Sequence, residues 1–147
     1  MMKLTVTIDA ETIDLEKIVQ RSQSNILELG GLALERETRK ASPVDTGHLQ
    51  GSWVNNTSKD QVQLSTSTHY ARYVDEGTGL YGPYKALIYP KDKKGSLMFK
   101  TGNGVTHIKY SKGIKGRHYI DKALNNFEAK LPNVIAQAIR KTSEGMK

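Results

Sequence analysis

The stretch that decides the fold is DLEKIVQRSQSNILELGGLALERETRK, residues 14–40. Its stripe-forming residues recur at intervals of three and four, the period of one face of an α-helix. That stripe consists of Leu15, Ile18, Val19, Ser22, Ile26, Leu29 and Ala33. Asp14 suits the N-cap, and Gly30-Gly31 inside the helix predicts a kink or a close backbone crossing.

A second long helix is predicted at the other end of the chain, from about Tyr119 to Thr142. Its stripe consists of Ile120, Ala123, Leu124, Phe127, Leu131, Val134, Ile135 and Ala138. Pro132 lacks a backbone donor, so a kink or a restart is expected there.

Between the helices, short segments with strand character alternate with turns. Polar and apolar residues alternate over residues 3–8, and Trp53–Thr57 and Gln61–Thr66 form a predicted hairpin around residues 58–60. A helical turn is expected over 69–76, with Tyr70, Tyr73 and Val74 on one face and Gly77 ending it in left-handed geometry. Further strands are predicted over 86–89, 97–100 and 105–110.

These elements predict one α+β domain over residues 1–147. An antiparallel, meandering β-sheet should pack against the two long helices, N-terminal and C-terminal, with a basic hairpin projecting around residues 91–104. The chain has no cysteine, no secretory signal pattern and no apolar run of membrane-spanning length. A soluble protein, made in the cytoplasm, is expected.

The charge of the chain is unevenly distributed. Residues 1–80 carry 8 Lys and Arg against 11 Asp and Glu, whereas residues 81–147 carry 14 against 4. Such asymmetry is typical of nucleic-acid contact, of a surface that meets an acidic partner or the acidic face of an identical neighbour, or simply of a solvated basic face. The candidate interface or DNA-facing cations are Lys91, Lys93, Lys94, Lys100, Lys109, Lys112, Lys115 and Arg117.

Nothing in the sequence predicts a catalytic centre, a cofactor or a metal site. The four histidines lack zinc-ligand spacing, and no serine lies in a nucleophile elbow. Residues 77–82 fit G-x-G-x-x-G, but Pro83-Tyr84 and a strand follow instead of a helix N-terminus that could face a pyrophosphate. An ordinary glycine-rich turn is the preferred interpretation, and the chain is not expected to be an enzyme.

Two segments resemble signatures of the head-tail joining family of long-tailed bacteriophages, also called neck or tail-completion proteins. ASPVDTGHL, residues 41–49, is similar to A-P-V-D-T-G-x-L, and YARYVDEGT, residues 70–78, is similar to Y-A-x-Y-V-E-x-G-T. A weaker match is HYIDKA, residues 118–123, where the family usually has Pro-Phe; Asp75 also replaces the usual Glu. The motif residues expected to determine the fold are Pro43, Asp45, Thr46, Gly47, Leu49, Tyr70, Tyr73, Asp75, Gly77 and Thr78.

The first motif is expected to form a rigid corner, with Asp45 and Thr46 bonding backbone amides and Leu49 and Trp53 anchoring the next segment in the core. The resemblance implies a structural virion protein of the neck. It would form a ring of six or twelve copies between connector or head-completion proteins and tail-terminator or tail-tube proteins, with non-specific contact to passing DNA and none to a membrane. The alternative hypothesis is a basic nucleic-acid-binding domain or small nuclease.

Overall fold

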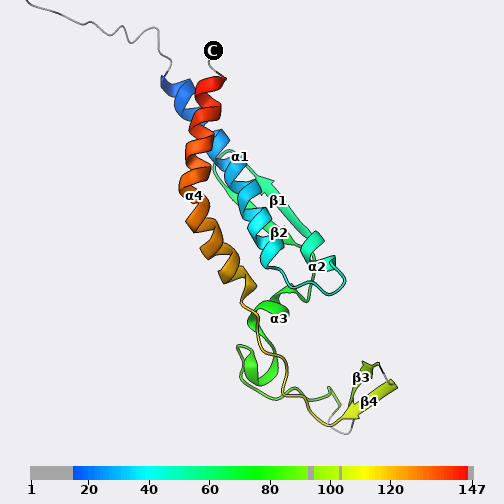
Figure 1. Cartoon of the computed structure of the whole chain (residues 1–147). Coiled ribbons are helices and arrows are strands. Elements are labelled where there is room, and N and C mark those ends of the chain that lie inside the picture. The colour runs from blue at the N-terminus through cyan, green and yellow to red at the C-terminus, as the bar shows by residue number, and fades with distance from the viewer. Residues whose placement is uncertain (1–14, 93–94, 103, 146–147) are drawn as a thin grey trace, which may run out of the picture.

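The computed structural model describes residues 15–92, 95–102 and 104–145, so the predicted strand at residues 3–8, Leu15's side chain and the Asp14 cap lie outside what is described. Two long helices dominate, α1 (Leu15–Ala41) and α4 (Tyr119–Glu144). They lie side by side and antiparallel (Figure 1), and Arg21 Nη1 donates to the Gly145 carbonyl at 3.0 Å. The two predicted long helices and the α+β class are therefore confirmed.

The interface between α1 and α4 combines apolar packing with a few polar contacts. Val134 and Ala138 of α4 are buried in it, and Asn25 Nδ2 donates to Thr142 Oγ1 at 3.0 Å. Lys130 Nζ donates to the Glu37 carboxylate at 2.6 Å, although Glu37 is 4% exposed. This hydrogen bond outweighs the effect of burial and lowers the pKa of the Glu37 carboxyl.

Two stripe residues do not lie where periodicity placed them. Val19 is 63% exposed and Leu124 is 43% exposed, because each lies at the margin of its stripe, turned away from the opposing helix. The expected restart at Pro132 is also absent from the described residues, since α4 continues through it as one helix.

The first hairpin packs against α1. It consists of β1 (Trp53–Thr57) and β2 (Val62–Thr66), with Trp53 opposite Thr66 and Thr57 opposite Val62. Gly31 of α1 explains how close this contact is: a Cβ there would lie 2.6 Å from Thr57 Oγ1 and 2.7 Å from Asn55 Nδ2. A neighbouring strand thus comes close to the glycine pair at Gly31, but it does so through the Asn55 and Thr57 side chains and not through the backbone crossing that was predicted.

A compact core forms where α1, β1 and α4 meet α3 (Ala71–Glu76) and the one-turn helix α2 (His48–Gly51). Leu49, Trp53, Ala71 and Tyr119 are its buried side chains. The Trp53 indole donates to Ser42 Oγ at 3.0 Å, and that hydroxyl donates to the Thr38 carbonyl. The Trp53 indole and the Ser42 hydroxyl therefore both have hydrogen-bond partners inside the core.

The second hairpin, β3 (Leu97–Thr101) paired with β4 (Gly104–Ile108), lies away from the helices at the far end of the molecule (Figure 1). The strands therefore form two separate two-stranded sheets. The strand predicted over 86–89 is reduced to a single bridge, Ile88 to Ser111. β4 ends before Tyr110 because its partner β3 begins at Leu97, opposite Ile108. We call residues 84–117 the arm and the remaining described residues the body.

Candidate functional site

The first motif forms the corner between α1 and β1, though by other bonds than expected. Within the described chain, the side chains of Asp45 and Thr46 form no hydrogen bond, so the predicted side-chain turn is wrong. Gly47 instead has a φ of 79°, which favours glycine, and its carbonyl accepts from Gly51 N at 2.9 Å. Gln50 Nε2 donates to the Arg39 carbonyl and fastens the corner to α1. The expected anchoring by Leu49 and Trp53 is confirmed, since both are buried.

The second motif forms α3 and its exit. Tyr70 and Val74 pack against the core, but Tyr73 is 56% exposed, so the three residues do not share one buried face as predicted. Gly77 ends the helix with a φ of 86° and a ψ of 178°. Its φ is positive as expected, but its ψ is extended instead of left-handed helical, because the chain leaves α3 directly into pairing with residues 112–118.

The segment after the second motif crosses the segment that returns from the arm. Backbone bonds join them at four places: Arg117 N to Val74 O, His118 N to Asp75 O, Thr78 N to Ile114 O, and Leu80 N to Lys112 O, all between 2.9 and 3.0 Å. The Thr78 hydroxyl also accepts from Ile114 N at 3.1 Å. We call this contact the crossing; it attaches the arm to the body.

Glycines allow the crossing to be this close. A Cβ on Gly77 would lie 2.6 Å from Gly116 N, and one on Gly113 would meet the Thr78 carbonyl. A Cβ on Gly82 would lie 2.8 Å from the Gly77 carbonyl. Gly77 and Gly82 of the G-x-G-x-x-G pattern therefore serve backbone packing. The sequence analysis missed their partners Gly113 and Gly116. Two glycines three residues apart were a usable signal of a close backbone approach.

Asp75 connects the crossing to α4. Its Oδ1 accepts from Ile120 N at 3.0 Å, in the first turn of α4, where backbone amides have no partner within the helix. His118, the N-cap by position, has a φ of 47° and makes no side-chain cap bond. The carboxylate thus comes from 45 residues earlier in the chain and faces the positive end of the helix dipole. No local pattern could have revealed this role.

Tyr119, which the sequence did not single out as a core residue, lies at the centre of this junction. It is 1% exposed, its hydroxyl donates to the Ala71 carbonyl at 3.3 Å, and its ring lies edge-on to Trp53 with 6.5 Å between centroids. Burial, with the nearby Asp75 carboxylate, raises the pKa of Tyr119 to about 12.

The two motifs meet at one cleft of about 340 Å³. It is lined by residues 43–49 from the first motif, Tyr70 and Val74 from the second, and Ile114, Lys115 and Arg117 from the segment that returns from the arm. A second cavity of about 420 Å³ lies beside α3, and Tyr73, Gly77 and Thr78 contribute to its lining. Two segments some twenty residues apart in sequence thus build adjacent walls of one surface.

The predicted cations divide between two places. Lys91 and Lys100 lie in the distal arm, whereas Lys109, Lys112, Lys115 and Arg117 lie between β4 and the body. All six are exposed, and Lys115 Nζ lies 5.6 Å from the centroid of the Tyr81 ring. Lys93 and Lys94 lie outside the described residues.

No family model, curated protein or solved structure matches this chain. In the described ranges, no three His, Asp or Glu residues gather in a way that could hold a metal ion. Nor does any helix of the described chain have the length and apolar character needed to cross a membrane.

Proposed function

We propose that this protein is a structural subunit of the head-tail junction of a long-tailed bacteriophage or prophage, located in the neck of the virion. The observation that carries the proposal is the meeting of the two motif segments at one cleft, with the segment that returns from the arm as its third wall. Two separate sequence resemblances to the same family thus describe one surface. The resemblance to the family itself rests on those motifs.

Such a subunit would act by binding its neighbours through complementary surfaces, and it would need no catalytic group. The crossing attaches the arm to the body, and the Asp75 cap connects the crossing to α4. The arm extends from the body as a hairpin. Residues 1–80 carry a net charge of −3 and residues 81–147 one of +10, so the acidic part of one copy attracts the basic part of the next. A heterologous contact of this kind closes into a ring, for which six or twelve copies would suit the junction.

Removing the gene from its phage or prophage tests the proposal. We expect lysates to contain DNA-filled heads and separate tails by electron microscopy, and a plasmid copy of the gene to restore tailed particles. A copy in which an Asn-Gly turn replaces residues 90–109 should stay folded but fail to restore them. Fully tailed, infectious particles in the absence of the gene would overturn the proposed function.

The competing hypothesis, a nucleic-acid-binding domain or small nuclease, makes different demands. It requires cleavage of a DNA or RNA substrate, or nanomolar binding at physiological salt together with normal particle assembly in the deletion strain. Incubation of the purified chain with supercoiled plasmid and divalent cations, followed on a gel, distinguishes a nuclease from the structural role, and the particles of the deletion strain distinguish a binding domain from it. An intact plasmid is expected under the structural role.

A further inference from the structure

We infer that the arm is a contact surface for the phosphate backbone of duplex DNA, without sequence preference. This inference deepens the proposed function and rests on it, since a subunit of the head-tail junction lies on the path of the genome. The arm has nine Lys and Arg against the single acid Asp92, a net charge of +8, whereas the rest of the chain sums to −1. The net charge of these 34 residues is therefore larger than the +7 of the whole chain.

The cations of the body and of the arm differ in how they are neutralised. In the body, five cations lie within 4 Å of a carboxylate: Arg39, Lys40, Arg72, Lys130 and Lys141. In the described arm, by contrast, no ion pair joins Lys85, Lys91, Lys100, Lys109, Lys112 or Arg117 to a described carboxylate. Ions or a polyanion outside the chain would relieve the mutual repulsion of these described cations.

Tyrosines accompany these cations on the arm. Tyr84 is 89% exposed, Tyr89 61% and Tyr110 49%. The Ile88–Ser111 bridge brings Tyr89 and Tyr110 together, with 6.2 Å between ring centroids. Phenolic hydroxyls donate readily to phosphate oxygens, which are the main hydrogen-bonding partners in protein–DNA complexes. The part of the arm nearest the body therefore offers both charge and neutral donors.

Charge decides between DNA and another copy of the chain as the occupant. In a second copy the body has no net charge, since its 11 Lys and Arg equal its 11 Asp and Glu, so it can neutralise only part of an arm of +8. Duplex DNA carries one negative charge for about every 1.7 Å of its axis, so it can neutralise every cation that reaches it. Lysine ammonium groups on flexible stems bind phosphates as point charges and read no base sequence.

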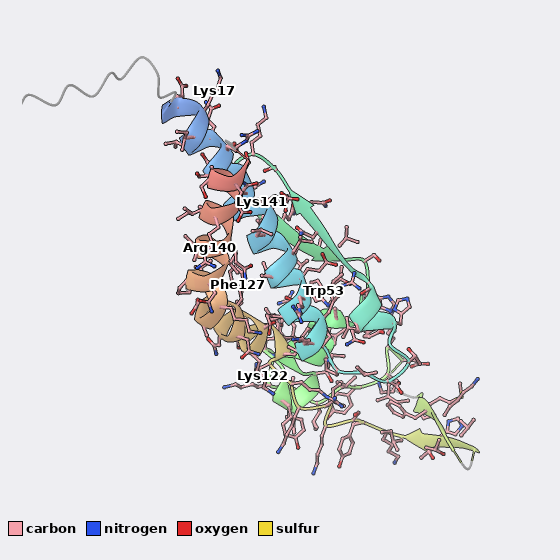
Figure 2. All side chains as sticks on the ribbon, turned by 45° about the horizontal axis from the view of Figure 1, so that its top comes forward. Lys17, Trp53, Lys122, Phe127, Arg140 and Lys141 are labelled. Carbon is pink, nitrogen blue, oxygen red and sulfur yellow. The ribbon has the colours of Figure 1, made fainter. Side chains whose placement is uncertain are left out.

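The test compares two triple variants of the full chain that lose the same charge. K100Q/K109Q/K112Q removes three arm cations, and K59Q/K122Q/R140Q removes three from the body, two of which project from α4 (Figure 2). Fluorescence anisotropy would measure binding to two unrelated 30-base-pair duplexes between 50 and 300 mM salt. Both duplexes should bind wild type equally, and the arm variant should bind at least roughly tenfold more weakly at the lowest salt. Its slope of log affinity against log salt should shrink by about 3, at roughly 0.9 per phosphate contact.

The body variant should stay within about threefold of wild type, because three distant charges act only through a screened field. Equal losses for both variants would show that only net charge matters and would overturn the inference. The absence of binding at 50 mM salt would overturn it as well. If the chain with residues 90–109 replaced by an Asn-Gly turn then still failed to join heads to tails, the arm would serve a protein partner. Failure of the DNA contact is thus distinguishable from failure of the proposed function, which the gene-deletion particles test separately.

Discussion

The body and the arm are built on opposite principles. The body buries a core of Leu49, Trp53, Ala71 and Tyr119, while none of the described residues between Pro83 and His118 is buried. The arm even leaves Phe99 45% and Met98 65% exposed on its hairpin. A two-stranded hairpin alone is marginally stable in water, so the arm gains little stability from its own packing. The body is held together by a buried core, whereas the described residues of the arm bury no side chain.

A tyrosine should contribute very differently to the free energy of unfolding in the two regions. Tyr119→Ala removes a fully buried ring and should lower the free energy of unfolding by about 3–5 kcal/mol. Tyr84→Ala removes a ring that is 89% exposed and should change it by less than about 0.5 kcal/mol. Urea denaturation followed by circular dichroism measures both, and comparable losses would contradict the division into body and arm.

The buried carboxylate between the long helices gives the next largest effect. Glu37→Gln should cost about 2 kcal/mol at neutral pH, the range of a hydrogen bond to a charged group. Because the folded-state pKa of Glu37 lies below its ordinary value of 4.5, its contribution is complete above that pH and is lost as the pH falls. Wild type should therefore lose more stability on acidification than the variant.

The matched control for Glu37 is Glu28→Gln, which breaks the exposed pair with Lys141. Its effect should stay below about 0.5 kcal/mol, as is usual for surface ion pairs. Equal effects at the two positions would mean that burial of Glu37 has no energetic consequence.

Loss of the remote cap should have a smaller effect, concentrated where body and arm join. Asp75→Ala leaves the Ile120 amide without its acceptor and should cost about 1 kcal/mol. Asp75→Asn keeps an oxygen acceptor and should cost less. Hydrogen exchange should locate the loss in the first turn of α4, and protection that is unchanged there would refute the capping role.

Removing the distal arm should have the smallest effect on stability. Replacing residues 90–109 by an Asn-Gly turn, which joins antiparallel strands well, should change the free energy of unfolding by less than about 0.5 kcal/mol. The reason is that no described residue in this range is buried. A cooperative loss of several kcal/mol would show that the hairpin belongs to the body's core.

Local patterns predicted most elements but not how they join. The two long helices and the hairpin of residues 53–66 followed from period and turn residues, and both strands of the distal hairpin were found within a few residues. Tyr73 was misplaced because α3 has only six residues, too few for periodicity to define a buried face. The hydrogen bonds expected of Asp45 and Thr46 failed because backbone and Gln50 contacts already hold that corner.

The sequence by itself determined the elements, the α+β class and the uneven charge, since helical period, turn chemistry and charge are properties of neighbouring residues. Only the tertiary structure decided that the two motifs share a cleft, that Gly77 meets Gly116, and that Asp75 caps a helix 45 residues away. Those contacts require backbone segments to be positioned to within about an ångström of each other's packing distance. The periodicity of a sequence does not encode distances between segments that are remote in the chain.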